Sequence, residues 1–514
     1  MYWFLVILTL LIGASLLKLE WGKHSVTLGT MPGPRGWPVV GSLLSLGELP
    51  HETFSQMAKI YGNVFKVRLG NRTIVVVNGM KAVRDALLKQ AVTFAGRPKF
   101  FSMQRLPVNE SNFFIQSHSQ RWNEQRKMVD SALKIFVDDR PKVMQEKIIT
   151  EGNELVRILT KDGKGNILDP HDDLHLSVGN ILSFVLFNTS YSHDNDKLKE
   201  IFSMVQKITK YLTGSGGLDD FLPLFRHFPS RQRDEFDRAQ ELQLGFLREQ
   251  IKKHQLTLKD GNPEDVIAYL LNIRKYGRET EVDIVQKDEN IAAMLDSVFG
   301  AGFDTMAKTL YVFFLYMILY PNVQEKAQQE IDIFIGRDRP PAFTDRQYLP
   351  YVDSLIYELL RHATLAPLSV PHAMVNDTRF YGFDIPKDTP VFPNLHSANF
   401  DETEWEDPDQ FKPERFLSQD GESLNKVKAA KLASFSFGKR RCPGEQLAQK
   451  ELFLFITLFL QRCTINKCPG DDPKLKWNHG LTLYPDRFKI LTTSRNPSSD
   501  QLVSQTEEDT ENIF

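Results

Sequence analysis

The segment SFSFGKRRCPGEQLAQKELFLF, residues 434–455, constrains this chain more than any other stretch. Cys442 stands between a basic, glycine-containing loop and an apolar stretch with helical spacing. We expect Pro443 in the first helical turn, where its missing N–H costs nothing. A thiol at the start of a helix has a lowered pKa, because unpaired backbone N–H groups favour the thiolate. The residues that form the apolar stripe of this helix are Leu447, Ala448, Leu452, Phe455 and Phe459.

A rigid thiolate with amide donors around it and one open face is what an axial ligand of haem iron requires. Gly438 and Gly444 would let the backbone pass close to a flat ligand. The alternative is a buried structural cysteine beside a solvated basic loop. The other two cysteines, Cys463 and Cys468, lack the nearby His or Cys partners that a zinc site needs.

The pattern F-x-x-G-x-R-x-C-x-G is met at Phe435, Gly438, Arg440, Cys442 and Gly444. With these five positions the segment resembles the haem-binding loop of the cytochrome P450 family. The resemblance implies the fold of that family, which is mainly α with a minor β portion. It also implies that Cys442 is the axial ligand of a haem b iron, with the other four residues around the cofactor.

The stretch DSVFGAGFDTMAKTLYVFFLYMILY, residues 296–320, resembles the oxygen-binding helix of the same family. Its glycines loosen the helix, and the Thr305 hydroxyl competes for the carbonyl one turn back, which opens a local notch. The resemblance implies that Asp304 and Thr305 deliver protons. Plain close helix packing is the alternative interpretation. Lys308 departs from the family pattern, in which a small residue is expected.

Two further motifs support the resemblance. YELLRH places Glu358 and Arg361 at i and i+3, and PERF supplies Arg415. In the family these three residues form a buried structural cluster behind the haem. The alternative for Glu358 and Arg361 is an exposed ion pair.

RWNEQRK places Trp122 and Arg126 one helical turn apart, so that an indole donor and a guanidinium can hold a carboxylate. In the family these two residues bind a haem propionate, and Arg97, His372 and Arg440 occupy positions that serve the same end. The alternative is a basic helix on the protein surface.

Composition excludes some classes of function. The chain has 514 residues, 41% of them hydrophobic, which is enough to bury a large core. Its formal net charge of −2 argues against nucleic acid as the main partner. Three cysteines do not support a disulfide framework, which suits a reducing compartment.

Residues 2–17 carry no charge, and a helix extended to Trp21 is about 30 Å long, the thickness of a bilayer core. Lys18 and Lys23 follow this run and no positive residue precedes it, which predicts a cytosolic body behind a single-pass membrane anchor. The alternative is a cleaved signal peptide. The resemblance to microsomal family members implies the endoplasmic reticulum membrane.

The remaining pattern divides the chain without internal repeats. Residues 63–79 alternate as a β-hairpin, residues 120–335 are mostly helical by period, and strand-like pieces return near 375–395 and 480–492. We therefore expect an anchor (1–21), a Pro/Gly-rich connector (22–38), a haem-thiolate catalytic domain (39–495) and a disordered acidic tail (496–514).

The resemblance implies a monooxygenase that inserts one oxygen atom from O2 into a lipophilic substrate, such as an aromatic xenobiotic, a steroid or a fatty acid. NADPH would supply electrons through NADPH–cytochrome P450 reductase, and cytochrome b5 is a further candidate partner. A basic proximal face would dock the reductase. The residues of this face are Arg121, Lys127, Lys134, Lys439 and Arg441.

The substrate pocket is expected to be mostly apolar, as a lipophilic ligand requires. Its expected walls are residues 101–118, the helix face around Ala301, residues 366–371, and Leu481 to Leu483, with Phe113, Phe114, Leu368 and Val370 among them. Two alternatives share Cys442: a haem-thiolate isomerase or dehydratase that needs no NADPH, and a non-enzymatic haem sensor without a substrate pocket. The Asp304–Thr305 pair argues against the isomerase.

Several stretches point to a branch of the family. GPRGWPVVG, FAGRP, DDFLPLFRHFP, FGAGFDT and VPH most resemble family 1, the aryl-hydrocarbon hydroxylases, whereas CPGE is closer to family 2 usage. From the sequence alone the branch, and with it the substrate, stays open.

Overall fold

The computed structural model describes residues 28–106, 112–160, 166–213, 216–258 and 262–495. The predicted anchor (1–21) and acidic tail (496–514) lie outside the described residues, and the connector is described only from Leu28. Within that part Gly33 passes so close to β1 (Val64–Leu69) that a Cβ would lie 1.9 Å from the Lys66 carbonyl oxygen. The described part of the connector therefore packs against the β1 strand.

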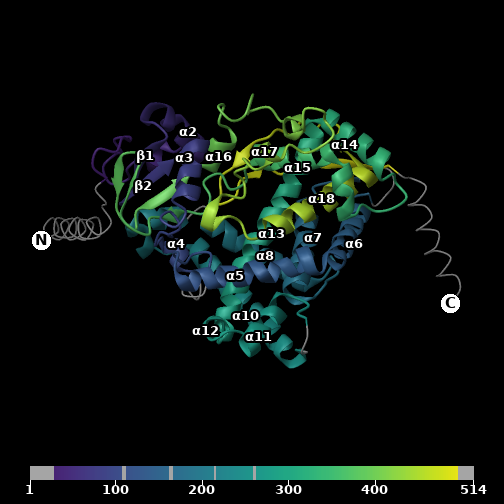
Figure 1. Ribbon diagram of the computed structural model, residues 1–514, viewed down its shortest axis with the longest axis horizontal. Helices are drawn as coiled ribbons and strands as arrows, with labels where there is room; N and C mark the ends of the chain where they lie inside the picture. Colours follow the sequence, from purple (N-terminus) through teal and green to yellow (C-terminus); the bar gives the residue numbers. More distant parts are fainter. Residues whose placement is uncertain (1–27, 107–111, 161–165, 214–215, 259–261, 496–514) are drawn as a thin grey trace, which may run out of the picture.

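Most of the described chain is helical, and Figure 1 shows the helices making up the bulk of the body. The longer helices are α2 (Pro50–Tyr61), α5 (Gln120–Lys134), α6 (Pro141–Leu159), α7 (His171–Phe187), α8 (Asp196–Thr213), α10 (Arg231–Thr257), α11 (Val266–Tyr276), α13 (Asp288–Leu319), α14 (Pro321–Phe334), α15 (Pro350–Ala363) and α18 (Glu445–Arg462). The shorter ones are α3 (Met80–Arg84), α4 (Phe101–Gln104), α9 (Gly216–Phe221), α12 (Glu279–Val285), α16 (Leu395–Asn399) and α17 (Lys426–Ala429).

Sequence signals fix several helix starts. Proline at the first position opens α2, α6, α14 and α15, where its missing N–H is not needed. The Ser119 side chain accepts a hydrogen bond from Trp122 N–H and caps α5, and Asp265 caps α11 in the same way. The helical prediction for 120–335 is confirmed apart from β3 (Asn166–Leu168), a short strand that joins the edge of β11 (Ile490–Ser494).

The β portion is small, as predicted. The hairpin of β1 and β2 (Arg72–Val77) pairs Val64 with Val77 and Leu69 with Arg72, and it extends through β7 (Pro390–Pro393) to β4 (His372–Ala373). The other strands of the described part are β5 (Thr378–Phe380), β6 (Phe383–Ile385), β8 (Cys463–Lys467), β9 (Trp477–Asn478) and β10 (Tyr484–Pro485). In Figure 1 the hairpin lies at one end of the body, and α14 and α18 lie at the other.

Helix α13 lies at the centre of the body, and every residue from Met306 to Met317 is buried. Among the described residues it is the one helix whose length and apolarity would suffice to cross a membrane, but 78% of its most apolar window is buried inside the protein. A helix that is apolar all round and covered by other helices is a core helix. Because α13 crosses the core, its first half can present side chains to an internal cavity.

Candidate active site

A cavity of about 370 Å³ lies beside α13. Apolar side chains make up most of its wall, including Leu182, Val205, Leu212 and Leu365, and Cys442 and Thr305 both line it. The cavity lining includes Phe113, Phe114, Ala301 and Val370, as predicted. Leu368, also predicted there, instead packs against a separate apolar cluster around the β1–β2 hairpin, so that prediction was wrong.

The Cys442 loop differs from the predicted helix start. Helix α18 begins at Glu445, so Pro443 precedes the helix, and the Cys442 N–H donates to the Phe435 carbonyl at 2.9 Å. Cys442 is exposed to the cavity, but the surrounding protein raises the pKa of its thiol to about 11 because burial disfavours the thiolate. The prediction of a lowered pKa was wrong, since burial outweighs the Gly444 N–H. A positive ligand at the sulfur would reverse this balance.

The two glycines of the motif have different structural roles. A Cβ on Gly438 would lie 1.8 Å from the carbonyl oxygen of Leu87 in η2 (Asp85–Lys89), so only glycine can pack there. Gly438 also has a positive φ of 68°, a backbone conformation that favours glycine. Gly438 is not among the described residues that line the cavity, and its expected place beside a flat ligand stays a prediction. Gly444 does line the cavity, and a Cβ there would lie 4.0 Å from Cys442 Sγ.

Arginines without acidic partners line the cavity near Cys442. Arg97 donates to the carbonyls of Phe114, Val370 and Pro371, and Arg440 donates to those of Ala95, Phe113 and Gln116. Among the described residues, neither guanidinium has a carboxylate within ion-pair distance. Burial lowers the pKa of Arg97 to about 9 and that of Arg440 well below its usual value. Two buried cations held in place without counter-charge fit an anionic ligand group.

The other predicted cofactor residues surround these arginines. Trp122 Nε1–H donates to the Phe113 carbonyl at 2.8 Å, and its ring lies 4.0 Å below the Arg440 guanidinium carbon. Its donor is thus engaged by the backbone, and the indole supports Arg440. Arg126 lines the cavity while bonding both oxygens of Asp130 at 2.9 Å. His372 is buried, and its Nδ1–H donates to the Phe94 carbonyl.

The hydrogen bond predicted for the notch in α13 is present at Thr305, within a continuous helix. Its hydroxyl donates to the Ala301 carbonyl at 2.8 Å, and Thr305 and Ala301 both line the cavity. A Cβ on Gly300 would meet no atom within 4 Å. The helix therefore presents a hydroxyl and a glycine-widened surface to the cavity.

Asp304 belongs to a buried polar triangle. Its Oδ2 accepts hydrogen bonds from Lys308 Nζ at 2.7 Å and from Thr482 Oγ1 at 2.8 Å, and Lys308 Nζ also donates to Thr482 Oγ1 at 2.8 Å. All three residues are buried. Sequence reasoning noted Lys308 only as a departure from the family pattern, although its i+4 spacing from Asp304 indicated an ion pair.

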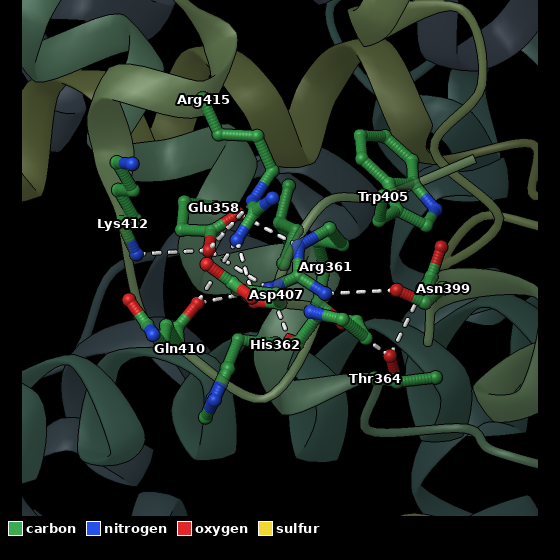
Figure 2. Close-up of polar contacts among 12 residues, drawn as sticks. Glu358, Arg361, His362, Thr364, Asn399, Trp405, Asp407, Gln410, Lys412 and Arg415 are labelled. Carbon is green, nitrogen blue, oxygen red and sulfur yellow. Dashed lines mark hydrogen bonds and ion pairs between the residues drawn. The ribbon is translucent and has the colours of Figure 1, made fainter. Parts of the chain in front are cut away.

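Glu358, Arg361 and Arg415 form a buried cluster, shown in Figure 2. Arg361 bonds both Glu358 oxygens at 2.7 and 2.8 Å, and its remaining N–H groups donate to the carbonyls of Asn399, Pro408 and Gln410. Arg415 Nε approaches Glu358 Oε1 at 3.4 Å. The alternative of an exposed pair does not hold, because both side chains of the Glu358–Arg361 pair are fully buried.

Two carboxyl groups of the cavity wall were not foreseen. Glu451 lies on α18, and burial raises its pKa to about 8. Asp296 lies on α13 and accepts a hydrogen bond from Gln243 Nε2 at 2.6 Å. Glu451 lies in the stretch 434–455 and Asp296 in the stretch 296–320, but neither occupies a fixed position of the motifs in them. Their place in the cavity wall depends on packing that the sequence pattern does not contain.

The cavity thus combines a thiol, a hydroxyl and two arginines without carboxylate partners, the features of a haem-thiolate site. The family model "Cytochrome P450" matches residues 31–492, and the chain belongs to this family. Family membership supports a haem-containing monooxygenase. Among individual proteins, the chain is 35% identical to human cytochrome P450 1B1 over 90% of the chain and 87% of the relative.

Two further relatives have similar values. The chain is 34% identical to cytochrome P450 1A1 of Pleuronectes platessa, over 91% of each protein. It is also 34% identical to cytochrome P450 1A5 of Gallus gallus, over 90% of the chain and 88% of the relative. The chain is thus a family 1-like cytochrome P450, and the branch that the sequence left open is resolved towards family 1.

Proposed function

We propose that the chain is an NADPH-dependent monooxygenase in which Cys442 is the axial ligand of haem b and a lipophilic compound is the substrate. The observation that carries this proposal is the single cavity lined by Cys442, Thr305 and the unpaired Arg97 and Arg440. Haem iron, when bound, would supply the activation of O2, one atom of which enters the substrate and the other leaves as water.

The residues present fit the cofactor. Burial raises the pKa of the Cys442 thiol to about 11, so the thiol needs a nearby cation to become a thiolate. Ferric iron is such a cation. Arg97 and Arg440 would bind the propionates, with Arg126 at the edge of the site, Trp122 supporting Arg440, and His372 packed behind. These charges would then pair, which removes the cost of burying them alone.

Thr305 is the proposed proton donor at the oxygen site. Its hydroxyl already donates to the Ala301 carbonyl, so it can pass a proton onward only by exchanging this bond for one to a cavity water or ligand. Asp304 is the proposed second member of the pair. Its Oδ2 is engaged by Lys308 and Thr482, so any proton it carries would leave through its other oxygen.

Electrons would arrive from NADPH–cytochrome P450 reductase, with cytochrome b5 as a second candidate partner. Lys439 and Arg441 lie on the Cys442 loop, and both are exposed. The Arg441 guanidinium is half-exposed and pairs with Glu445. Such a face would attract an acidic flavoprotein. The anchor of residues 1–21 would hold the chain in the endoplasmic reticulum membrane with the catalytic domain in the cytosol.

Turnover of the purified holoprotein on a panel of lipophiles, with and without NADPH and reductase, tests the proposal. Oxygenated products that require NADPH and reductase are expected. Rearranged or dehydrated products without NADPH would instead indicate an isomerase or dehydratase. Absence of any spectral shift of the haem band across the panel would indicate a sensor.

A further inference from the structure

One carboxyl group of the cavity wall has no cation to neutralise it. Asp296 lies on α13 nine residues before Thr305, about 14 Å along the helix axis, and only 6% of it is exposed. Gln243 of α10 donates to its Oδ1. Within the described part of the chain, no Lys, Arg or His forms an ion pair with this carboxyl.

The other acidic groups of the cavity wall are neutralised. Asp304 pairs with Lys308, and the pKa of Glu451 is raised to about 8, so that its carboxyl is protonated at neutral pH. Burial raises the pKa of Asp296 only to about 6, so this group is ionised at neutral pH. Of the described residues that line the cavity, Asp296 therefore carries the one negative charge without compensation.

The neighbouring amides increase the demand for a hydrogen-bond donor. Gln240 lies one turn before Gln243 on α10 and lines the same cavity. Among the described residues, neither Gln240 amide atom has a hydrogen-bond partner, and the same holds for Gln243 Oε1. The group thus contains a carboxylate and two unpaired amide oxygens, against the unpaired NH2 group of Gln240. Unpaired buried polar atoms are costly, and a ligand that pairs with them gains that free energy.

We propose that Asp296, with Gln240 and Gln243, binds the protonated amine of an otherwise apolar substrate, so that lipophilic amines are preferred over neutral lipophiles. This inference rests on the proposed function, because it takes the cavity to be the substrate cavity. An ammonium group brings the positive charge and the N–H donors that this part of the wall lacks. The apolar side chains of the remaining wall cover the rest of the substrate.

The test uses two ligands of the same shape. 4-(Dimethylaminomethyl)biphenyl is protonated at neutral pH, and 4-isobutylbiphenyl is its uncharged carbon isostere. Calorimetric titration of the purified holoprotein at neutral pH is expected to show roughly tenfold or tighter binding of the amine. Asp296→Asn keeps an acceptor for Gln243 and removes the charge, so the two ligands should then bind within about threefold of each other.

Controls separate the possible outcomes. Asp384→Asn changes an exposed carboxylate and should retain the amine preference. Asp296→Asn removes a buried charge, and its urea midpoint should be unchanged or raised, which verifies folding. Equal affinities in the unaltered chain, or a preference that survives Asp296→Asn because the amine binds iron or another group, would overturn the inference. A holoprotein that prefers the amine but forms no product that requires NADPH would instead contradict the proposed function, while the amine preference would still be measured.

Discussion

Lys308→Met tests the buried polar triangle, in which Lys308 contributes the only cation near Asp304 among the described residues. The side chains of the pair are 10% and 9% exposed, and their atoms are 2.7 Å apart. Methionine has a similar length but no charge, so the variant leaves the Asp304 carboxylate buried with Thr482 as its remaining donor. Removing one partner of a buried ion pair costs about 3–5 kcal/mol. We therefore expect a loss of this size in the free energy of unfolding.

Urea denaturation of the variant and a matched control measures this loss. Lys326→Met breaks an ion pair with Glu414 whose lysine is 57% exposed, so it should cost at most about 1 kcal/mol. The double variant Asp304→Leu/Lys308→Met removes both charges and should lie within about 1 kcal/mol of the unaltered chain. A Lys308→Met variant no less stable than Lys326→Met would refute the reasoning.

Three other perturbations follow from the site. Thr305→Ala should uncouple NADPH consumption from product formation and yield peroxide, because the hydroxyl at the notch is lost; unchanged coupling would exclude the proton-delivery role. The pKa of Glu451 is about 8 in the folded protein against an ordinary value of 4.5, so the carboxyl takes up a proton on folding between these pH values. The free energy of unfolding should therefore be highest below pH 4.5 and fall as the pH rises to 8. Glu451→Gln should abolish this slope and stabilise the chain by about 4 kcal/mol at pH 8, measured by urea denaturation against pH; a slope that persists would contradict the raised pKa. Arg361→Lys should cost about 3 kcal/mol, because lysine cannot bond both Glu358 oxygens and the three carbonyls together; near-unchanged stability would contradict the role of the cluster.

Residues that are close in sequence were the most predictable. The β1–β2 hairpin follows from alternation around Gly70–Asn71, and the Thr305 bond to the Ala301 carbonyl follows from helical spacing. The pairing of Glu358 with Arg361 was also predictable, because the two residues are three positions apart on one helix. Their complete burial was not, because it depends on Asn399, Pro408 and Gln410, which lie elsewhere in the chain.

Properties that depend on distant packing were not predictable. The Cys442 pKa was expected to fall because a helix start was assumed, yet the enclosing protein raises it. Gly438 is required by the Leu87 carbonyl, a contact across about 350 residues that no local pattern contains. The unpaired charge of Asp296 could not be predicted, because it depends on α10, a distant helix that places the Gln243 amide, and no cation, against this carboxylate.

The central claim is that the sulfur of Cys442 holds the haem iron, and one spectrum tests it most directly. The reduced protein under carbon monoxide should show the absorption band specific to a thiolate ligand. Cys442→Ser should lose that band while Arg97 and Arg440 remain in place to bind the propionates. If the band persists in Cys442→Ser, another side chain is the ligand and the account is contradicted.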